Sequence, residues 1–403
     1  MPERFIARQP IFDKHLQVYA YELLFRSGPQ NFFQPGRNVS TSVIADSATF
    51  FDLQALIGPA RAFVNVDALA LKLGVARLLP ADRIVVEILE TVKPSEEIVA
   101  ICRDLRDAGY LLALDDFTGD PNLNPLVELA QFLKVDFQLL DEEGRASVAK
   151  KYGNGKLSLL AEKVETERDL AQARHHGYSY FQGYFFCKPS MIQAREIPGD
   201  KLLQLELLNA VAAPEIDYAK IEDLLKRQPS LLYRLLRYLN SPLLGLRTEI
   251  HSVRQGLALL GETEFRRSVS VFAILDMGSG KPPELIRTAL TRAYFCEGLS
   301  CAAGLSRKKS SLFLMGLLSI TDALLDKPIA EVLEALRVTQ EVKTALIGGD
   351  GENRLREVYN LLLSVERAEW SQLSSHVGHL GCPEGSIPDC YKAALQKASA
   401  ISL

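Results

Sequence analysis

Histidine, cysteine and tryptophan are scarce in this chain of 403 residues, which contains six histidines, six cysteines and one tryptophan. No two cysteines form a C-x-x-C pair; they are Cys102, Cys187, Cys296, Cys301, Cys382 and Cys390. Structural zinc centres are normally built from such pairs or from grouped histidines. The scattered cysteines indicate reduced, mostly buried thiols, as in cytosolic proteins.

The chain also lacks a long apolar run and a strong excess of charge. Its start, MPERFIARQP, carries charges and a proline where a signal peptide has an apolar core. The longest apolar run, near residues 311–320, is shorter than the roughly 20 residues that span a bilayer. A formal net charge of -4 gives no general attraction to nucleic acid or anionic lipid. We expect a cytoplasmic protein that binds neither membranes nor nucleic acid directly.

What the chain does contain is the composition of a folded protein, with 47% hydrophobic and 24% charged residues, and a length that suits two domains. Short runs rich in Val, Ile, Leu and Phe predict strands buried on both faces. These runs are residues 18–25, 63–66, 84–89, 111–117, 132–137, 157–164 and 180–186. Between them, residues 95–108 and 165–176 have acidic first turns and are followed by glycine, as helices often are. Such alternation predicts a (β/α) barrel or a doubly wound sheet.

Polar residues recur within or at the ends of these apolar runs. They are Glu22, Asn65, Glu87, Asp115, Asp116, Lys134, Asp136, Glu162, Glu165 and Gln182. A charged group inside an apolar strand is costly unless it is paired or bound to a metal. Any one of them could be an ordinary strand-end charge that reaches solvent. In a (β/α) barrel, however, the carboxyl ends of the strands meet at one face, so the whole set predicts one shared cleft.

The donor atoms of this set are carboxylate and amide oxygens, with no histidine or cysteine. Such hard ligands suit Mg²⁺, Mn²⁺ or Ca²⁺. Carboxylates that hold two such ions about 4 Å apart suit attack of water on a phosphodiester. Lys134 would orient that water or stabilise charge on the phosphate oxygens. The residues alone therefore predict a metal-dependent phosphodiesterase.

The same residues, in the same order, resemble the EAL domain, which hydrolyses the bacterial messenger cyclic-di-GMP. The resemblance covers about residues 1–195 and implies a TIM-like barrel over residues 1–197. The signature Glu-Ala-Leu stands here as Glu22-Leu23-Leu24, with Arg26 at the place of a phosphate-contacting arginine. The other matching motifs are Asn65, Glu87-Ile88-Leu89-Glu90, Asp115-Asp116-Phe117-Thr118, Lys134-Val135-Asp136, residues 161–165 (AEKVE) and residues 182–189 (QGYFFCKP).

The resemblance implies a role for each matched residue, and two Mg²⁺ or Mn²⁺ ions as cofactors. The implied roles are metal binding for Glu22, Asn65, Glu87, Asp115 and Asp116, catalysis for Lys134, Glu162 and Glu165, substrate binding for Arg26 and Gln182, and loop anchoring for Glu90. Of the metal ligands, Asp116 would belong to the second ion.

Two departures from the EAL pattern bear on activity. The family follows Asp-Asp-Phe with a mobile glycine-rich loop that ends in two serines and supports metal binding and dimerisation. Residues 118–125 read TGDPNLNP instead, without the serine pair and with two prolines that restrict motion. Lys163 replaces a glycine next to Glu162. Weak or absent turnover is therefore expected.

Beyond a break at residues 197–200 (IPGD), apolar residues recur at three- and four-residue intervals and predict a helical bundle. The predicted helices are residues 201–211, 218–226, 230–239, 254–260, 265–275 and 284–299. The stretches QPSLLYRLLRYLNSPLLG and EIHSVRQGLALLG resemble the HDOD domain. We expect an all-helical HDOD-like domain over residues 201–403, with residues 327–403 as further helix.

The second half lacks the metal ligands of its relatives. HDOD domains are related to HD phosphohydrolases, which bind metal through histidines and a His-Asp dipeptide. This chain has no His-Asp dipeptide, and Ser319-Ile320 stands at the expected place. We therefore expect no zinc or iron here. His376, His379 and Cys382 fall at helical spacing, and we interpret them as ordinary helix and loop residues rather than ligands.

The opening FIARQPIFD and VYAYELLFR resemble a subgroup in which an EAL-like barrel precedes an HDOD domain and many members look catalytically degenerate. Two hypotheses follow. In the favoured one, the barrel binds or weakly hydrolyses cyclic-di-GMP and the HDOD domain relays the signal through a protein partner. In the alternative, the protein is a fully active metal-dependent cyclic-di-GMP phosphodiesterase. The oligomeric state stays open.

Overall fold

The computed structural model describes residues 4–27, 53–153, 155–187, 199–213, 215–240, 250–349 and 352–401. Its contacts divide the chain into two compact units. The first comprises Met1–Phe186 with Leu363–Ser375 and Ile387–Lys392, and the second comprises Cys187–Leu362, His376–Ser386 and Ala393–Leu403. The domain limits expected from the sequence, 1–197 and 201–403, stay a prediction, since residues 188–198 lie outside the described ranges.

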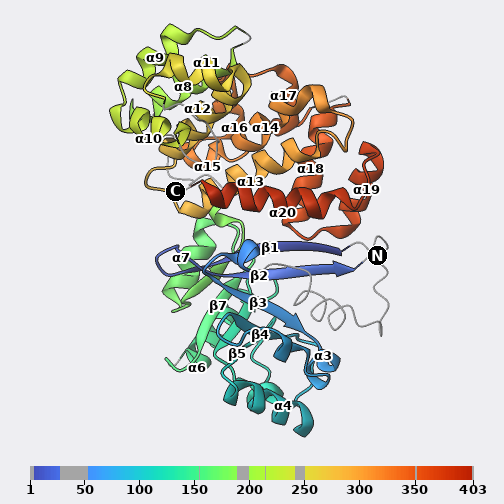
Figure 1. Cartoon of the computed structure of the whole chain (residues 1–403). Coiled ribbons are helices and arrows are strands. Elements are labelled where there is room, and N and C mark those ends of the chain that lie inside the picture. The colour runs from blue at the N-terminus through green and yellow to red at the C-terminus, as the bar shows by residue number, and fades with distance from the viewer. Residues whose placement is uncertain are drawn as a thin grey trace. The chain divides into compact units, whose positions relative to one another are not determined.

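Eight strands close into a barrel in the first unit (Figure 1). They are β1 (Arg4–Asp13), β2 (Val18–Ser27), β3 (Arg61–Val66), β4 (Ile84–Ile88), β5 (Leu111–Leu114), β6 (Phe132–Asp136), β7 (Ser158–Glu162) and β8 (Tyr180–Gln182). Neighbouring strands from β2 to β8 are parallel, so their carboxyl ends meet at one end of the barrel, which we call the mouth. The predicted barrel is confirmed, and a doubly wound sheet is excluded.

Strand β1 was not among the predicted strands. It pairs antiparallel with both β2 and β8 and closes the barrel. A tight turn at residues 13–17 joins it to β2, with the Asp13 N–H donating to the Gln17 carbonyl at 2.9 Å. Its apolar residues are interrupted by Arg8, Gln9 and Pro10, which conceals the strand pattern in the sequence.

Helices connect the strands of this unit. They are α2 (Leu53–Ile57), α3 (Ala68–Lys72), η1 (Val75–Leu78), α4 (Glu96–Asp107), η2 (Pro121–Leu123), α5 (Asn124–Val127), α6 (Glu142–Tyr152), α7 (Glu167–His175) and η3 (Phe185–Cys187). The two helices expected from the sequence are α4 and α7. Ser95 caps α4 by accepting from the Ile98 N–H, and Thr166 forms a capping box with Asp169 on α7.

The alternation of side chains along each strand places the mouth residues. One apolar cluster fills the barrel interior: Ile11, Ala20, Phe63, Val85, Ala113, Phe132 and Leu160. Successive side chains on a strand point to opposite faces, so residues two apart share a face. Two residues further toward the mouth stand, in the same strand order, Gln9, Glu22, Asn65, Glu87, Asp115, Lys134 and Glu162. The polar cluster is therefore the layer directly above an apolar core.

The described chain after Cys187 is helical and contains no strand, which confirms the all-helical prediction for the second half. Its helices are α8 (Gly199–Ala212), α9 (Tyr218–Lys226), α10 (Pro229–Leu239), α11 (Val253–Leu260), α12 (Glu262–Met277), α13 (Pro283–Leu299), η5 (Ser306–Lys308), α14 (Lys309–Leu318), α15 (Thr321–Leu325), α16 (Ile329–Ala335), α17 (Gln340–Ile347), α18 (Arg354–Glu366), α19 (Trp370–Leu380) and α20 (Ser386–Ala400). Within the described residues, no helix combines the length and apolar character that crossing a membrane requires.

The second unit packs most closely where α13 meets α14. Gly316 on α14 lies against the backbone of Arg292 on α13, and an added Cβ there would stand 2.5 Å from the Arg292 carbonyl oxygen. The Arg292 side chain is buried and donates from Nη1 to Ser319 Oγ at 3.1 Å. Ser319, which occupies the place of the expected His-Asp dipeptide, is thus part of a buried polar contact.

Candidate active site at the barrel mouth

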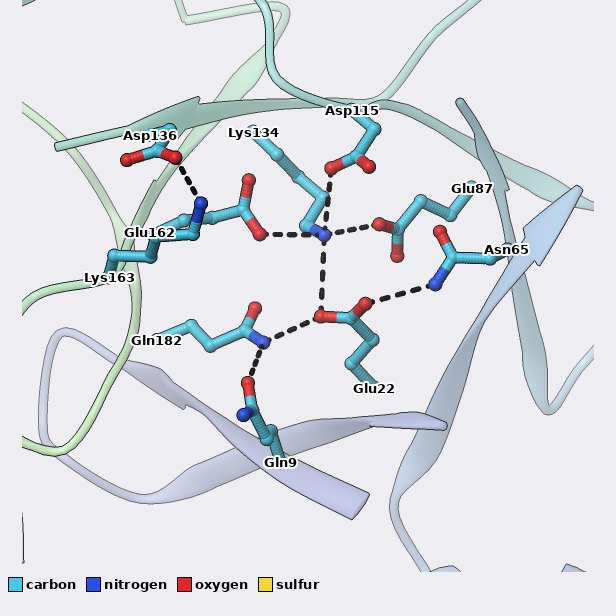
Figure 2. Close-up of polar contacts among 10 residues, drawn as sticks. All are labelled: Gln9, Glu22, Asn65, Glu87, Asp115, Lys134, Asp136, Glu162, Lys163 and Gln182. Atoms are coloured by element: carbon cyan, nitrogen blue, oxygen red, sulfur yellow. Dashed lines mark hydrogen bonds and ion pairs between the residues drawn. The ribbon is translucent and has the colours of Figure 1, made fainter. Parts of the chain in front are cut away.

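The ammonium of Lys134 lies among four carboxylates at the mouth (Figure 2). Its Nζ is 2.8 Å from Glu162 Oε1, 3.1 Å from Asp115 Oδ1 and 3.4 Å from Glu22 Oε2, and it also contacts Glu87 Oε1. Lys134 is 1% exposed and Glu87 is fully buried. The strands β2, β4, β6 and β7 each contribute one member and Asp115 directly follows β5, so the structure brings these five predicted residues together at the mouth.

Amide side chains surround this cluster on the Glu22 side. Asn65 Nδ2 donates to Glu22 Oε1 at 3.0 Å, and Gln182 Nε2 donates to Glu22 Oε2 at 2.6 Å. Gln182 Nε2 also donates to Gln9 Oε1 at 3.0 Å. Gln9 was not predicted as a site residue. Its register opposite Glu22 on the antiparallel strand β1 brings it to the mouth, and that pairing is a long-range feature.

Several oxygen atoms at the mouth are buried and have no hydrogen-bond partner among the described residues. They are Asn65 Oδ1, Glu87 Oε2, Glu162 Oε2 and Gln182 Oε1. Buried acceptors without partners are unusual in native proteins and call for a ligand or ion. Carboxylate and amide oxygens are the donors that Mg²⁺, Mn²⁺ and Ca²⁺ take. By donor type, Asn65 Oδ1 and Glu87 Oε2 therefore fit a hard divalent cation, while the full ligand set of Glu22, Asn65, Glu87 and Asp115 stays a prediction.

Burial and mutual repulsion shift the ionisation of these carboxyls. Burial raises the pKa of Glu162 to about 8, and the nearby Asp115 and Glu22 carboxylates add to the effect while Lys134 opposes it. Burial and the neighbouring carboxylates also raise the pKa of Glu87. Burial would lower the pKa of Lys134, but its carboxylates hold that pKa well above its usual value. Burial opposes ionisation of Asp115, yet Lys134 keeps its pKa below the usual range. The lysine therefore stays charged, while burial favours the neutral form of Glu162.

A second carboxylate group lies next to the first. Glu90, Asp115 and Asp116 each place one oxygen within 4.8 Å of the others, so these three could also hold a metal ion. Burial raises the pKa of Asp116, with Asp115 adding to the effect. Asp116 is the residue that the EAL resemblance assigns to a second ion, and Glu90 is the implied loop anchor.

The segment after Asp116 is folded into short helical turns. Asp120 Oδ1 accepts from the Asn122 N–H at 2.9 Å and caps η2, whose first residue is Pro121, and α5 follows directly. This turn depends on Asp120 and Pro121, two of the residues by which segment 118–125 differs from the glycine-rich EAL loop.

Two further predicted site residues are Glu165 and Arg26. Glu165 Oε1 accepts from Gln138 Nε2 at 2.9 Å, next to the start of α7. Arg26 belongs to strand β2, but its side chain lies outside the described residues. Neither placement tests their implied roles, which stay predictions.

One further group of potential ligands occurs in the second unit. Glu357 on α18 and His376 and His379 on α19 place their ligand atoms within 4.8 Å of one another. The Nδ1 atoms of His376 and His379 lie 2.9 and 3.4 Å from Glu357 Oε2. The histidine spacing noted in the sequence thus brings both rings to one glutamate, while the absence of zinc and iron from this unit stays a prediction.

Comparison with known proteins agrees with these features. The EAL domain family model matches residues 59–189, and the HDOD domain family model matches residues 197–345. The chain is 34% identical over 382 residues to the cyclic di-GMP phosphodiesterase CdgJ of Vibrio cholerae, covering 94% of this chain and 88% of that protein. It is 32% identical over 403 residues to the uncharacterized protein YuxH of Bacillus subtilis, covering 97% of each.

Among solved structures, an EAL domain protein from Listeria monocytogenes is similar at 21% identity and a TM-score of 0.38, covering 46% of this chain and 87% of that one. The two full-length relatives and the two domain matches together assign the family. The chain belongs to the family of proteins that join an EAL domain to an HDOD domain.

Proposed function

We propose that the barrel is a receptor for cyclic-di-GMP with weak phosphodiesterase activity at most, and that the HDOD unit relays the signal through a protein partner. The observation that carries the proposal is the set of oxygen donors around Lys134, with buried oxygens of Asn65 and Glu87 left without partners. Such a set suits a divalent cation, and a divalent cation suits a phosphodiester ligand.

In this proposal Glu22, Asn65, Glu87 and Asp115 hold one Mg²⁺ or Mn²⁺ ion. When bound, that ion supplies Lewis-acid stabilisation of charge on the phosphate oxygens. Lys134 keeps its positive charge through its four carboxylate neighbours and offsets their repulsion in the absence of metal. Burial raises the pKa of Glu162 to about 8, so this side chain is suited to hold or release a proton.

Gln182 is suited to orient the nucleotide. Its Nε2 is held by Glu22 and Gln9, which fixes the amide plane and leaves Oε1 buried and free to accept an N–H. A rigidly held acceptor is worth more for recognition than a mobile one, because less freedom is lost on binding.

Weak turnover is proposed because the segment that follows Asp116 is already folded. Residues 118–125 form the capped turn of η2 and the start of α5, and Pro121 and Pro125 remove two backbone donors. A misplacement of about 1 Å at a reacting group can lower the rate on the order of a hundredfold.

A relay role for the HDOD unit is supported by its chemistry. Ser319 stands where a metal-binding dipeptide would be expected, and it is paired with the buried Arg292. A buried guanidinium at this place is unfavourable for a metal cation, so the unit is better suited to binding another protein than to hydrolysis.

The second candidate, a fully active phosphodiesterase, is favoured by the extended similarity to CdgJ, which is named a cyclic di-GMP phosphodiesterase. One experiment separates the two. Binding and hydrolysis of cyclic-di-GMP are measured with Mg²⁺ and with Mn²⁺ on the full chain, on Asp115→Ala and on the surface control Lys150→Gln. We expect binding with slow or undetectable hydrolysis in the full chain and in the control, and loss of binding in Asp115→Ala. Rapid hydrolysis would favour the enzyme, and no binding at all would refute both.

A further inference from the structure

Helix α18 ends in a well-defined cap. The Ala368 N–H donates to the Val365 carbonyl at 3.2 Å and the Glu369 N–H donates to the Ser364 carbonyl at 2.9 Å, which is the pattern of a Schellman motif. Ala368 has a φ of 56°, in the left-handed region that this motif requires and that glycine usually occupies. The turn therefore has a fixed shape, and it lies in the segment Leu363–Ser375, which belongs to the same compact unit as the barrel.

The carbonyl of Glu366, in the last turn of α18, accepts from side chains of the barrel. Tyr184 Oη donates to it at 2.7 Å, and Gln9 Nε2 lies 3.5 Å from it, at the upper limit of a hydrogen bond. The Arg367 guanidinium lies over the Tyr184 ring, 5.8 Å from its centroid, within the range of a cation–π contact. The carbonyls at the end of a helix need such donors, because they have no partners within the helix. The last turn of α18 is thus bonded to residues at the barrel mouth.

Tyr184 is rigidly connected to Gln182. The Val164 N–H donates to the Gln182 carbonyl at 2.9 Å, and the Phe185 N–H donates to the Val164 carbonyl at 3.2 Å, so the residues on both sides of the Gly183–Tyr184 pair are bonded to Val164. Gly183 lies so close to Val164 that a Cβ there would stand 2.0 Å from its carbonyl oxygen. A displacement of Tyr184 therefore disturbs the strand end that carries Gln182.

Gln9 provides a second connection, and this one has a direction. A carbonyl oxygen can only accept, so Gln9 presents Nε2 to Glu366 and Oε1 to Gln182 Nε2, which is 3.0 Å away (Figure 2). Glu22 Oε2 also accepts from Gln182 Nε2, at 2.6 Å, and favours the same orientation. Gln182 Oε1 is left as a buried acceptor, and it is the atom that the proposed function assigns to the nucleotide.

We propose that Tyr184 and Gln9 are positioning residues that tie the orientation of Gln182 to the last turn of α18, so that the C-terminal segment 363–375 completes the nucleotide site of the barrel. The inference deepens the proposed function and rests on it, because it requires that the nucleotide contacts Gln182. Helix α18 begins at Arg354, among residues of the second unit, and ends among residues of the first. It is thus a covalent route by which a change in the second unit reaches the nucleotide site.

The test is the affinity of the full chain for cyclic-di-GMP in Mg²⁺, measured by isothermal titration calorimetry. Tyr184→Phe removes the hydroxyl and keeps the ring beside Arg367. Tyr110→Phe is the matched control, because Tyr110 Oη also donates to a backbone carbonyl, that of Leu79, at 2.7 Å, and Tyr110 precedes β5 at the end of the barrel opposite the mouth. We expect the affinity to fall about three- to tenfold in Tyr184→Phe and to stay unchanged in Tyr110→Phe.

A double-mutant cycle tests whether Tyr184 acts through Gln182. In the Gln182→Ala background, Tyr184→Phe should cause no further loss of affinity. A second readout does not need Gln182→Ala to retain binding. Linkage requires that the nucleotide stabilises the turn by the same factor by which the turn favours the nucleotide. Hydrogen exchange of the Ala368 and Glu369 amides in the natural protein should therefore slow about three- to tenfold in saturating cyclic-di-GMP.

Equal affinity of the natural protein and Tyr184→Phe would overturn the inference. Equal losses with and without the Gln182 side chain would overturn it as well, and so would exchange in the turn that the nucleotide leaves unchanged. Failure of the natural protein to bind cyclic-di-GMP is a different result, which would refute the proposed function together with the inference that rests on it.

Discussion

The ammonium of Lys134 is the group whose removal should disturb the barrel most. Lys134→Met keeps most of the side-chain volume and removes the charge. It leaves Glu22, Glu87, Asp115 and Glu162 facing one another with no cation, and Glu87 is fully buried. Removal of one partner of a buried ion pair costs about 3–5 kcal/mol.

The expected loss of about 3–5 kcal/mol in the free energy of unfolding corresponds to a measurable fall in melting temperature. A domain of 150–250 residues shifts by roughly 2–4 °C per kcal/mol, so the barrel transition should fall by roughly 6–20 °C. Differential scanning calorimetry of the full chain in a chelator measures the shift, with Lys150→Gln as the control that should melt like the natural protein.

Two conditions should restore much of the lost stability. Saturating Mn²⁺ supplies a cation to the same oxygens. Lower pH lets carboxyls such as Glu87, whose pKa is already raised, take up protons, so the deficit should shrink between pH 8 and pH 5. A barrel transition within 2 °C of the natural protein at pH 8 in chelator would refute the account of Lys134 as the charge that holds the carboxylates together.

The remaining predictions concern other parts of the site. Folding raises the pKa of Glu162 from 4.5 to about 8, so between these pH values the folded state binds more protons than the unfolded state. The free energy of unfolding should therefore fall as the pH rises through this range, by at most about 1.4 kcal/mol per pH unit. Glu162→Gln should weaken this pH dependence in melting curves from pH 5 to pH 9, and an unchanged slope would contradict the raised pKa. Gly183→Ala should lower the melting temperature of the barrel, because its Cβ would meet the Val164 carbonyl, and unchanged melting would show that β8 can move away. A Gly-Thr-Gly-Tyr-Ser-Ser graft at residues 118–123 should raise hydrolysis of cyclic-di-GMP if the folded segment limits turnover, and an inert graft that still binds nucleotide would identify the barrel as a receptor. Elemental analysis of the purified chain should find well under one zinc or iron per chain, and a stoichiometric amount that is lost in His376→Ala would contradict the metal-free prediction for the second unit.

The sequence pattern by itself determined the alternation of strands and helices, the helical second half and the candidate residues at the mouth, and the resemblance to the EAL domain selected a barrel over a doubly wound sheet. Each of these depends on local regularities. Side chains alternate between the two faces of a strand, so Phe63 and Asn65 share a face, as do Phe132 and Lys134. Ser95 and Thr166, each followed by acidic residues, mark the starts of α4 and α7. Because parallel strands end at one face, the polar residues were expected to meet.

The tertiary structure decided which residues the side chains at the mouth contact. Lys134 meets carboxylates that stand 112 residues before it and 28 residues after it, and no local pattern shows that one ammonium serves all four. The antiparallel course of β1 brings Gln9 to the mouth, and it depends on pairing with both β2 and β8. Gly183, directly after β8, approaches Val164 so closely that a Cβ there would lie 2.0 Å from the Val164 carbonyl oxygen. Contacts of this kind are set by chain segments distant in sequence, so they become visible only when the barrel closes.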